Sequence, residues 1–94
     1  MHGIDVIEER QIDHGWVFRC SIADTCEVEI TLDWVDYNRW CPAGTAAPRA
    51  VAEAVLACFL AHGVTVPPKL DAGRVRRLGD RADDHVRKAI TAYE

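Results

Sequence analysis

A chain of 94 residues is long enough for one domain, and we expect a single domain over residues 1–94. With 49% hydrophobic and 28% charged residues, the composition argues against an intrinsically disordered protein, and a net charge of -4 disfavours nucleic acid as a partner. The sequence has no long apolar run and no basic, apolar leader, so we expect no membrane span, no signal peptide and a cytoplasmic protein with reduced thiols.

The N-terminal quarter of the chain predicts two antiparallel strands. Residues 4–12 alternate weakly and carry many charges, which is typical of an edge strand. One face of the strand at residues 16–22 is apolar and consists of Trp16, Phe18, Cys20 and Ile22. Between the strands, residues 13–15 end in Gly15 and predict a three-residue loop with a left-handed glycine. This loop would place Ile12 opposite Trp16.

Residues 26–34 are the most regularly patterned stretch, because every even position is apolar and every odd position is polar. Strict alternation of this kind predicts a half-buried strand. Apolar side chains must oppose apolar ones, so a three-residue loop should place Cys20 opposite Val28 and Phe18 opposite Ile30. The three strands then form an antiparallel meander, and we expect this third strand to lie at an edge of the sheet.

Helices are expected to cover the apolar face of that sheet. A broad apolar stripe predicts a main helix at residues 48–62, with Thr45 as its cap and Gly63 as its end. Residues 64–68 should be extended, because two prolines follow. Shorter helices are predicted at residues 34–40, 72–78 and 81–93.

The predicted fold class is therefore α+β: a three-stranded antiparallel meander packed on one face by a main helix, with shorter C-terminal helices. Its predicted core consists of Trp16, Phe18, Cys20, Ile22, Val28, Ile30, Leu32, Val51, Val55, Phe59 and Ile90.

The layout resembles that of small bacterial proteins of unknown function. The likeness rests on the three strands, the stretch Asp-Trp-Val-Asp-Tyr-Asn-Arg-Trp at residues 33–40, the alanine-rich helix and the stretch Pro-Pro-Lys-Leu-Asp-Ala-Gly-Arg-Val-Arg-Arg at residues 67–77. It covers most of the chain. The resemblance implies no catalytic or binding residue.

Our first functional hypothesis is a non-enzymatic interaction module without a cofactor, acting through an unknown protein partner or as a homodimer. A regular edge strand can pair with another chain, and its outward residues would be Glu27, Glu29 and Thr31. Aromatic residues and arginine typical of interface anchors follow directly, as Trp34, Tyr37, Arg39 and Trp40. The alternative for the two tryptophans is that they fill the end of the core.

A second hypothesis is a nucleic-acid-binding regulator that grips phosphates with a C-terminal arginine cluster. The cluster consists of Arg74, Arg76, Arg77 and Arg81. Aspartates are interleaved with these arginines, which favours a solvated, salt-bridged surface instead.

A third hypothesis is a zinc or thiol site at Cys58 and His62, which lie one helical turn apart. A small core thiol and a histidine favoured by the helix dipole explain the same pair without a metal. For catalysis the sequence offers only Cys41 before a proline and the scattered histidines, and it contains no known catalytic motif. We therefore do not expect an enzyme.

Overall fold

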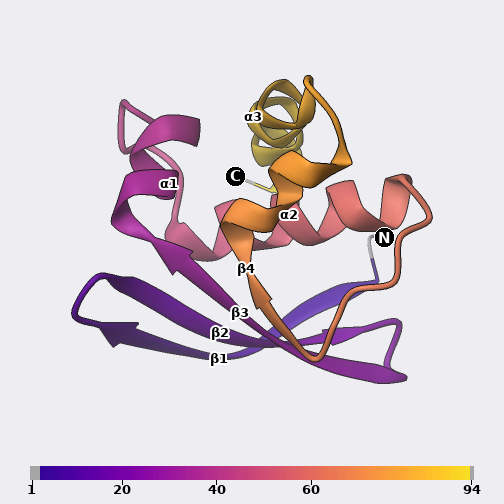
Figure 1. Ribbon diagram of the computed structural model, residues 1–94. Helices are drawn as coiled ribbons and strands as arrows, with labels where there is room; N and C mark the ends of the chain where they lie inside the picture. The colour runs from indigo at the N-terminus through magenta and orange to yellow at the C-terminus, as the bar shows by residue number, and fades with distance from the viewer. Residues whose placement is uncertain (1–2, 94) are drawn as a thin grey trace.

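A four-stranded mixed sheet forms one layer of the protein, in the order β1-β2-β3-β4 (Figure 1). The computed structural model describes residues 3–93, and the side chains of residues 3–91. Strands β1 (Ile4–Ile12), β2 (Gly15–Ile22) and β3 (Cys26–Asp33) form the predicted antiparallel meander. Strand β4 (Lys69–Asp71) runs parallel to β3 and adds a fourth strand to the three predicted ones.

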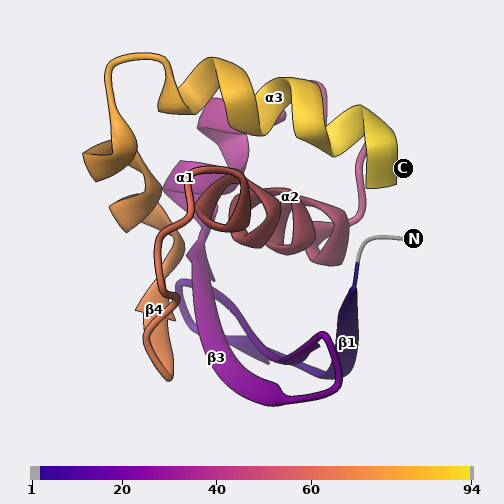
Figure 2. The same ribbon diagram turned by 90° about the vertical axis from the view of Figure 1, so that its right-hand side faces the viewer.

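Helices stack on one face of the sheet in two further layers (Figure 2). Helix α2 (Pro48–Ala61) lies next to the sheet, and α3 (Ala82–Tyr93) packs on the opposite side of α2. Helix α1 (Trp34–Trp40) and the 3-10 helix η1 (Ala72–Leu78) flank this stack. Because α2 is covered from both sides, apolar residues occupy nearly its whole circumference.

The core between α2 and the sheet confirms the predicted α+β fold and its main helix. Phe18, Ile30 and Val51 are completely buried, and Ile90 of α3 is also buried. Of the predicted core residues, only Ile22 is half-buried, and it lies at the turn end of the β2–β3 hairpin. No helix in the described part of the chain is long and apolar enough to cross a membrane.

The register between β2 and β3 is the predicted one. Cys20 lies opposite Val28, and Phe18 opposite Ile30. The loop of residues 23–25 closes this hairpin with Ala23 and Asp24 in the left-handed region, at φ 54° and 58°. Matching the two apolar faces was therefore sufficient to fix this pairing.

The first hairpin differs from its prediction. Ile12 pairs with Gly15, and Gln11 lies opposite Trp16, so the connection has two residues and Gly15 belongs to the strand. A bulge between Val6 and Glu8 shifts the register of β1. An extra residue in one strand reverses which face the following side chains occupy, so an unbroken alternation was the wrong assumption for residues 4–12.

Strand β4 corrects the expectation that β3 is an edge strand over its whole length. It pairs Lys69 with Glu29 and Asp71 with Thr31, so the middle of β3 lies inside the sheet. Only one of its three residues, Leu70, is buried. So short a strand has no alternation from which to predict it.

A side chain caps η1 but not α2. Asp71 caps η1 by accepting a hydrogen bond from the Gly73 N–H at 3.0 Å. Residue Ala47, not Thr45, occupies the cap position of α2, and no side chain caps that helix. The missing N–H of Pro48 at the first position reduces the need for a cap.

Candidate functional site

The N-terminal end of β3, Cys26–Val28, keeps a free edge. The Glu29 N–H donates to the Pro68 carbonyl at 2.8 Å, on the side away from β2. Backbone groups two residues apart in a strand point the same way, so the N–H and C=O of Glu27 face this side too. Within residues 3–93, no strand pairs with Cys26–Val28 there.

Pro68 explains why the chain's own ladder stops at Glu29. In a parallel pair aligned as Glu29 with Lys69, the Glu27 carbonyl would take its hydrogen bond from the N–H of residue 68. Proline has no N–H, so this bond cannot form. The edge of β3 at Glu27 therefore stays unpaired, because the linker between α2 and β4 has a proline at this position.

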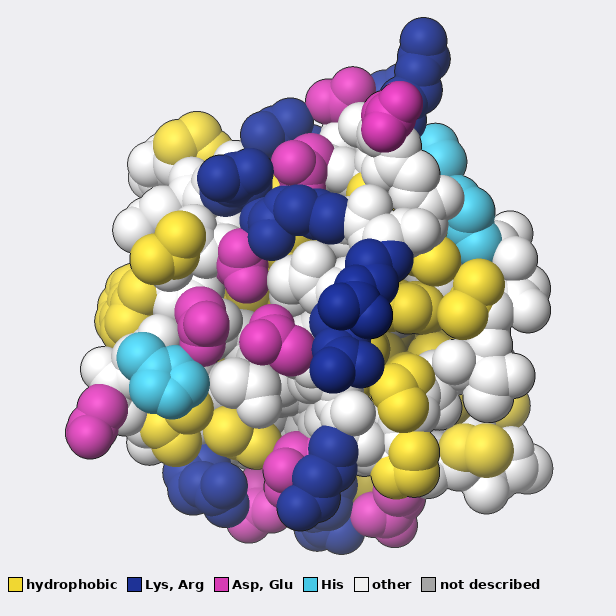
Figure 3. Space-filling view, viewed as in Figure 1, with side chains coloured by type: hydrophobic (Ala, Val, Ile, Leu, Met, Phe, Trp, Pro, Cys, Tyr) yellow, Lys and Arg dark blue, Asp and Glu magenta, His cyan; other side chains and the backbone are white. Residues whose placement is uncertain are grey.

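An apolar groove with a volume of about 350 Å³ opens beside this free edge. Residues from the β2–β3 hairpin line one wall, and the end of α2 with the following linker lines the other. The apolar lining residues are Ile22, Cys26, Val28, Leu60, Val64 and Val66. Hydrophobic side chains gather on the right-hand side of the space-filling view (Figure 3). Leu60 and Val64, which line the groove together, remain 42% and 39% exposed and form part of one apolar patch.

Charged side chains form a ladder across the open face of the sheet and end at the free edge. Arg19 of β2 lies 3.5 Å from Glu8 of β1 and 3.1 Å from Glu27 of β3. The Glu27 side chain is still 59% exposed. The outermost charge of the ladder is thus a carboxylate that one arginine only partly covers.

The predicted interaction residues of β3 separate into two groups. Glu27 lies on the free edge, whereas Glu29 and Thr31 are half-buried beside β4. Those two residues line a second hollow, of about 290 Å³, with Asp71, Lys69 and other polar residues. On the face shown in Figure 3, acidic and basic side chains alternate.

The aromatic side chains of α1 lie mainly in the core and only partly on the surface. Trp40 and Tyr37 are buried, and the Tyr37 hydroxyl donates to the Ala46 carbonyl at 2.6 Å. Trp34 packs against Trp16 with a centroid distance of 4.4 Å but remains 42% exposed. Of the four predicted anchor residues, only Trp34 and Arg39 reach the surface.

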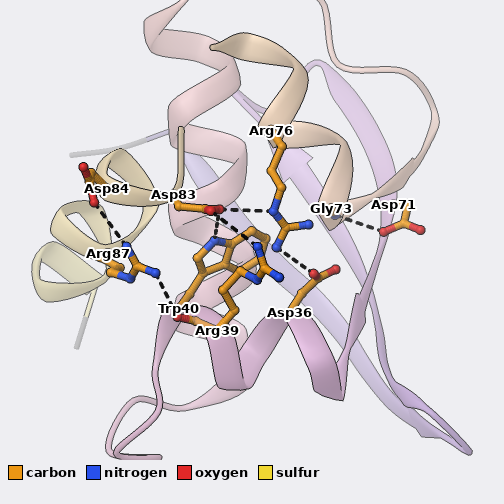
Figure 4. Close-up of polar contacts among 9 residues, drawn as sticks. All are labelled: Asp36, Arg39, Trp40, Asp71, Gly73, Arg76, Asp83, Asp84 and Arg87. Atoms are coloured by element: carbon orange, nitrogen blue, oxygen red, sulfur yellow. Dashed lines mark hydrogen bonds and ion pairs between the residues drawn. The ribbon is translucent and has the colours of Figure 1, made fainter. Parts of the chain in front are cut away.

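One member of the predicted arginine cluster, Arg76, is engaged inside the protein (Figure 4). Its guanidinium donates to Asp36 at 2.8 Å, lies 3.2 Å from a carboxylate oxygen of Asp83, and covers the ring of Trp40 at 5.2 Å. The Trp40 ring N–H donates to the same Asp83 oxygen at 2.7 Å. Arg74, Arg77 and Arg81 stay exposed, so the cluster does not form one uniform basic surface.

Asp83 should make the stability of this network depend on acid pH. Burial acts to raise the pKa of Asp83, but the Trp40 N–H and the charges of Arg76, Arg39 and Arg87 outweigh it and lower the pKa below 3.8. A carboxylate whose pKa is lowered by folding stabilises the folded state at any pH above its ordinary pKa. This contribution is lost as the pH falls through the pKa of the folded state. We therefore expect the free energy of unfolding, measured with urea, to fall less for Asp83→Asn than for the wild type as the pH drops below 3.8.

Asp13→Asn provides the control for that measurement, because Asp13 lies exposed in the first turn. It should leave the acid dependence of the free energy of unfolding unchanged. Equal acid dependence in Asp83→Asn and the wild type would contradict the assignment.

The predicted zinc pair does not assemble into a larger ligand set. Cys58 is buried, which raises the pKa of its thiol, and the Nδ1–H of His62 donates a 2.8 Å hydrogen bond to the Cys58 carbonyl. The His62 ring faces His85 of α3 with a centroid distance of 5.4 Å. The described residues contain no group of three or more histidine, cysteine or acidic side chains able to hold a metal ion.

Cys41, the weak catalytic candidate, is buried rather than exposed. Burial acts to raise the pKa of its thiol, but hydrogen bonds from the backbone of Ala46 and Thr45 and from the Thr45 hydroxyl lower it below the ordinary value. His14 lies elsewhere, paired with Asp33 at 2.7 Å. This structure does not bring the thiol and that histidine together as a nucleophile and its base.

One wall of the groove consists of Leu60, Val64 and Val66, which were not among the predicted site residues. The available signal was the apolar alternation of Val64-Thr65-Val66 in a stretch that the prolines keep extended. No protein-family model, no curated protein and no solved structure matches the chain.

Proposed function

We propose that the protein is a non-enzymatic interaction module that captures an extended segment of a partner protein at Cys26–Val28. The observation that carries this proposal is the position of the apolar groove directly beside the unpaired end of β3. In this binding mode, main-chain hydrogen bonds to the strand edge supply affinity and side-chain pockets supply specificity. Both elements are present at one place on the surface.

The groove favours an interaction over a purely structural role. An exposed strand edge invites pairing with other chains, and proteins that do not use such an edge cover it or protect it with charges. Strand β1 follows that rule with a row of exposed charged residues. At Cys26–Val28 the edge carries a single charge, Glu27, and adjoins a group of exposed apolar side chains, which is typical of binding surfaces.

The test is selection from a library of short random peptides with the purified protein. We expect the enriched peptides to be extended and apolar, and to lose binding to the double variant Leu60→Asp, Val64→Asp, which places two charges in the groove. Both positions are partly exposed, so the variant should remain folded. Circular dichroism and thermal melting establish that it does.

Val35→Asp is the matched control, because Val35 is 72% exposed on α1 and does not line the groove. It makes the same chemical change at another exposed apolar position. Peptides that bind the double variant and Val35→Asp as tightly as the wild type would overturn the proposal, as would a selection without enrichment.

A further inference from the structure

We infer that the captured segment carries a lysine or arginine opposite Glu27, flanked on both sides by apolar residues. This inference rests on the proposed function and specifies the chemistry of the partner. Successive side chains of a strand point to opposite faces. The residue paired with Glu27 therefore lies on the open face of the sheet, and its two neighbours point toward the groove between the sheet and α2.

The charge ladder selects the sign of the central residue. Across three neighbouring strands the charges alternate as negative, positive and negative in Glu8, Arg19 and Glu29, which are directly paired. Glu27 lies diagonal to Arg19 and forms an ion pair with it at 3.1 Å. Opposite charges on directly paired residues stabilise neighbouring strands, and like charges destabilise them. A strand added beside Glu27 continues the alternation only with a positive side chain.

Strand β4 already obeys this rule two residues further along β3. It places Lys69 opposite Glu29 on the open face and the buried Leu70 on the core face. The captured segment would add the same arrangement of a basic residue next to an apolar one where the prolines prevent β4 from continuing.

The charge of Glu27 also disfavours a second copy of this chain as the partner that binds at the free edge. In a symmetric antiparallel pair confined to Cys26–Val28, with core faces aligned, Glu27 lies opposite Glu27 of the other copy. Two carboxylates would then face each other at the centre of the contact. Each copy also carries a net charge of -4, so the two molecules repel at a distance as well.

The experiment compares two designed peptides that differ only at the central position of an apolar–X–apolar sequence, with lysine or glutamate as X. Binding to the isotope-labelled protein is followed through the amide signals of Glu27 and Val64, together with protection of the Glu27 N–H from hydrogen exchange. The wild type should bind the lysine peptide about fivefold more tightly than the glutamate peptide. Glu27→Lys should reverse this preference.

Glu9→Lys makes the same change of charge at the opposite edge of the sheet, where Glu9 is exposed on β1, and should keep the wild-type preference. Two results would be informative in different ways. Equal binding of both peptides, unchanged in Glu27→Lys, would overturn this inference and leave the proposed function intact. If neither peptide perturbs Glu27 or Val64, and the library selection also fails, the proposed function itself is wrong.

Discussion

Replacing Gly15 with alanine is expected to lower the free energy of unfolding by about 3 kcal/mol, at the upper end of what single substitutions usually cost. A Cβ atom at Gly15 would lie 2.0 Å from the carbonyl oxygen of Leu32 and 2.9 Å from the Cα atom of Asp33. Both are backbone atoms of β3, so no side chain can move aside. Strands β2 and β3 would have to separate where the His14 carbonyl accepts a hydrogen bond from the Trp34 N–H at 2.9 Å.

Thermal unfolding measures this effect directly. Each kcal/mol shifts the Tm of a domain of this size by about 4–8 °C, so Gly15→Ala should lower Tm by at least about 12 °C. Gly44→Ala is the control: Gly44 has φ +68°, but a Cβ atom added there would meet no heavy atom within 4 Å apart from its chain neighbours. It isolates the cost of a left-handed alanine, about 1–2 kcal/mol. Equal effects of the two substitutions would show that the close approach at Gly15 is unimportant.

The sequence predicts the fold best where two strands pair that both alternate regularly between apolar and polar residues. The faces of residues 16–22 and 26–34 can match in only one register, and the structure has that register. The bulge in β1 follows from no local signal, because the residues that directly follow it are polar and mostly exposed, so no apolar side chain marks the change of face. Strand β4 depends on a partner distant in the sequence, and a single buried Leu70 gives no pattern.

The candidate site was predictable only in part, for a related reason. The alternation of β3 correctly placed Glu27 on the polar face, but it could not show that β4 covers Glu29 and Thr31. The groove combines residues of a hairpin, a helix end and a linker, and each segment contributes only a few apolar side chains. Tertiary packing decides which of these residues lie together on one surface. The periodicity of apolar residues along the sequence does not contain that information.

The arginine cluster shows how one residue can differ from its neighbours. Arg76 and Arg77 are adjacent in η1, and nothing in the sequence pattern distinguishes one from the other. The 3-10 helix turns Arg76 toward Asp36 of α1 and Asp83 of α3, whereas Arg77 is exposed and forms no ion pair within the described residues. We therefore expect substitution of Arg76 to destabilise the protein much more than substitution of Arg77.

Arg76→Ala should lower the free energy of unfolding by about 2–3 kcal/mol, which is less than a fully buried pair would lose because the Arg76 side chain is 34% exposed. The loss arises because the Asp36 side chain, only 12% exposed, would remain as a carboxylate without its cation. Urea unfolding provides the measurement. Arg77→Ala, the adjacent control, should change stability by no more than about 0.5 kcal/mol.

Arg76→Lys separates charge from geometry in the same network. A lysine keeps the positive charge, but its single ammonium group lacks the planar fork with which Arg76 reaches Asp36 and Asp83 and covers Trp40 (Figure 4). The lysine variant should therefore fall between Arg76→Ala and the wild type. Stability equal to that of the wild type would mean that charge alone holds α1, η1 and α3 together. Stability equal to that of Arg76→Ala would mean that the geometry of the guanidinium provides the whole effect.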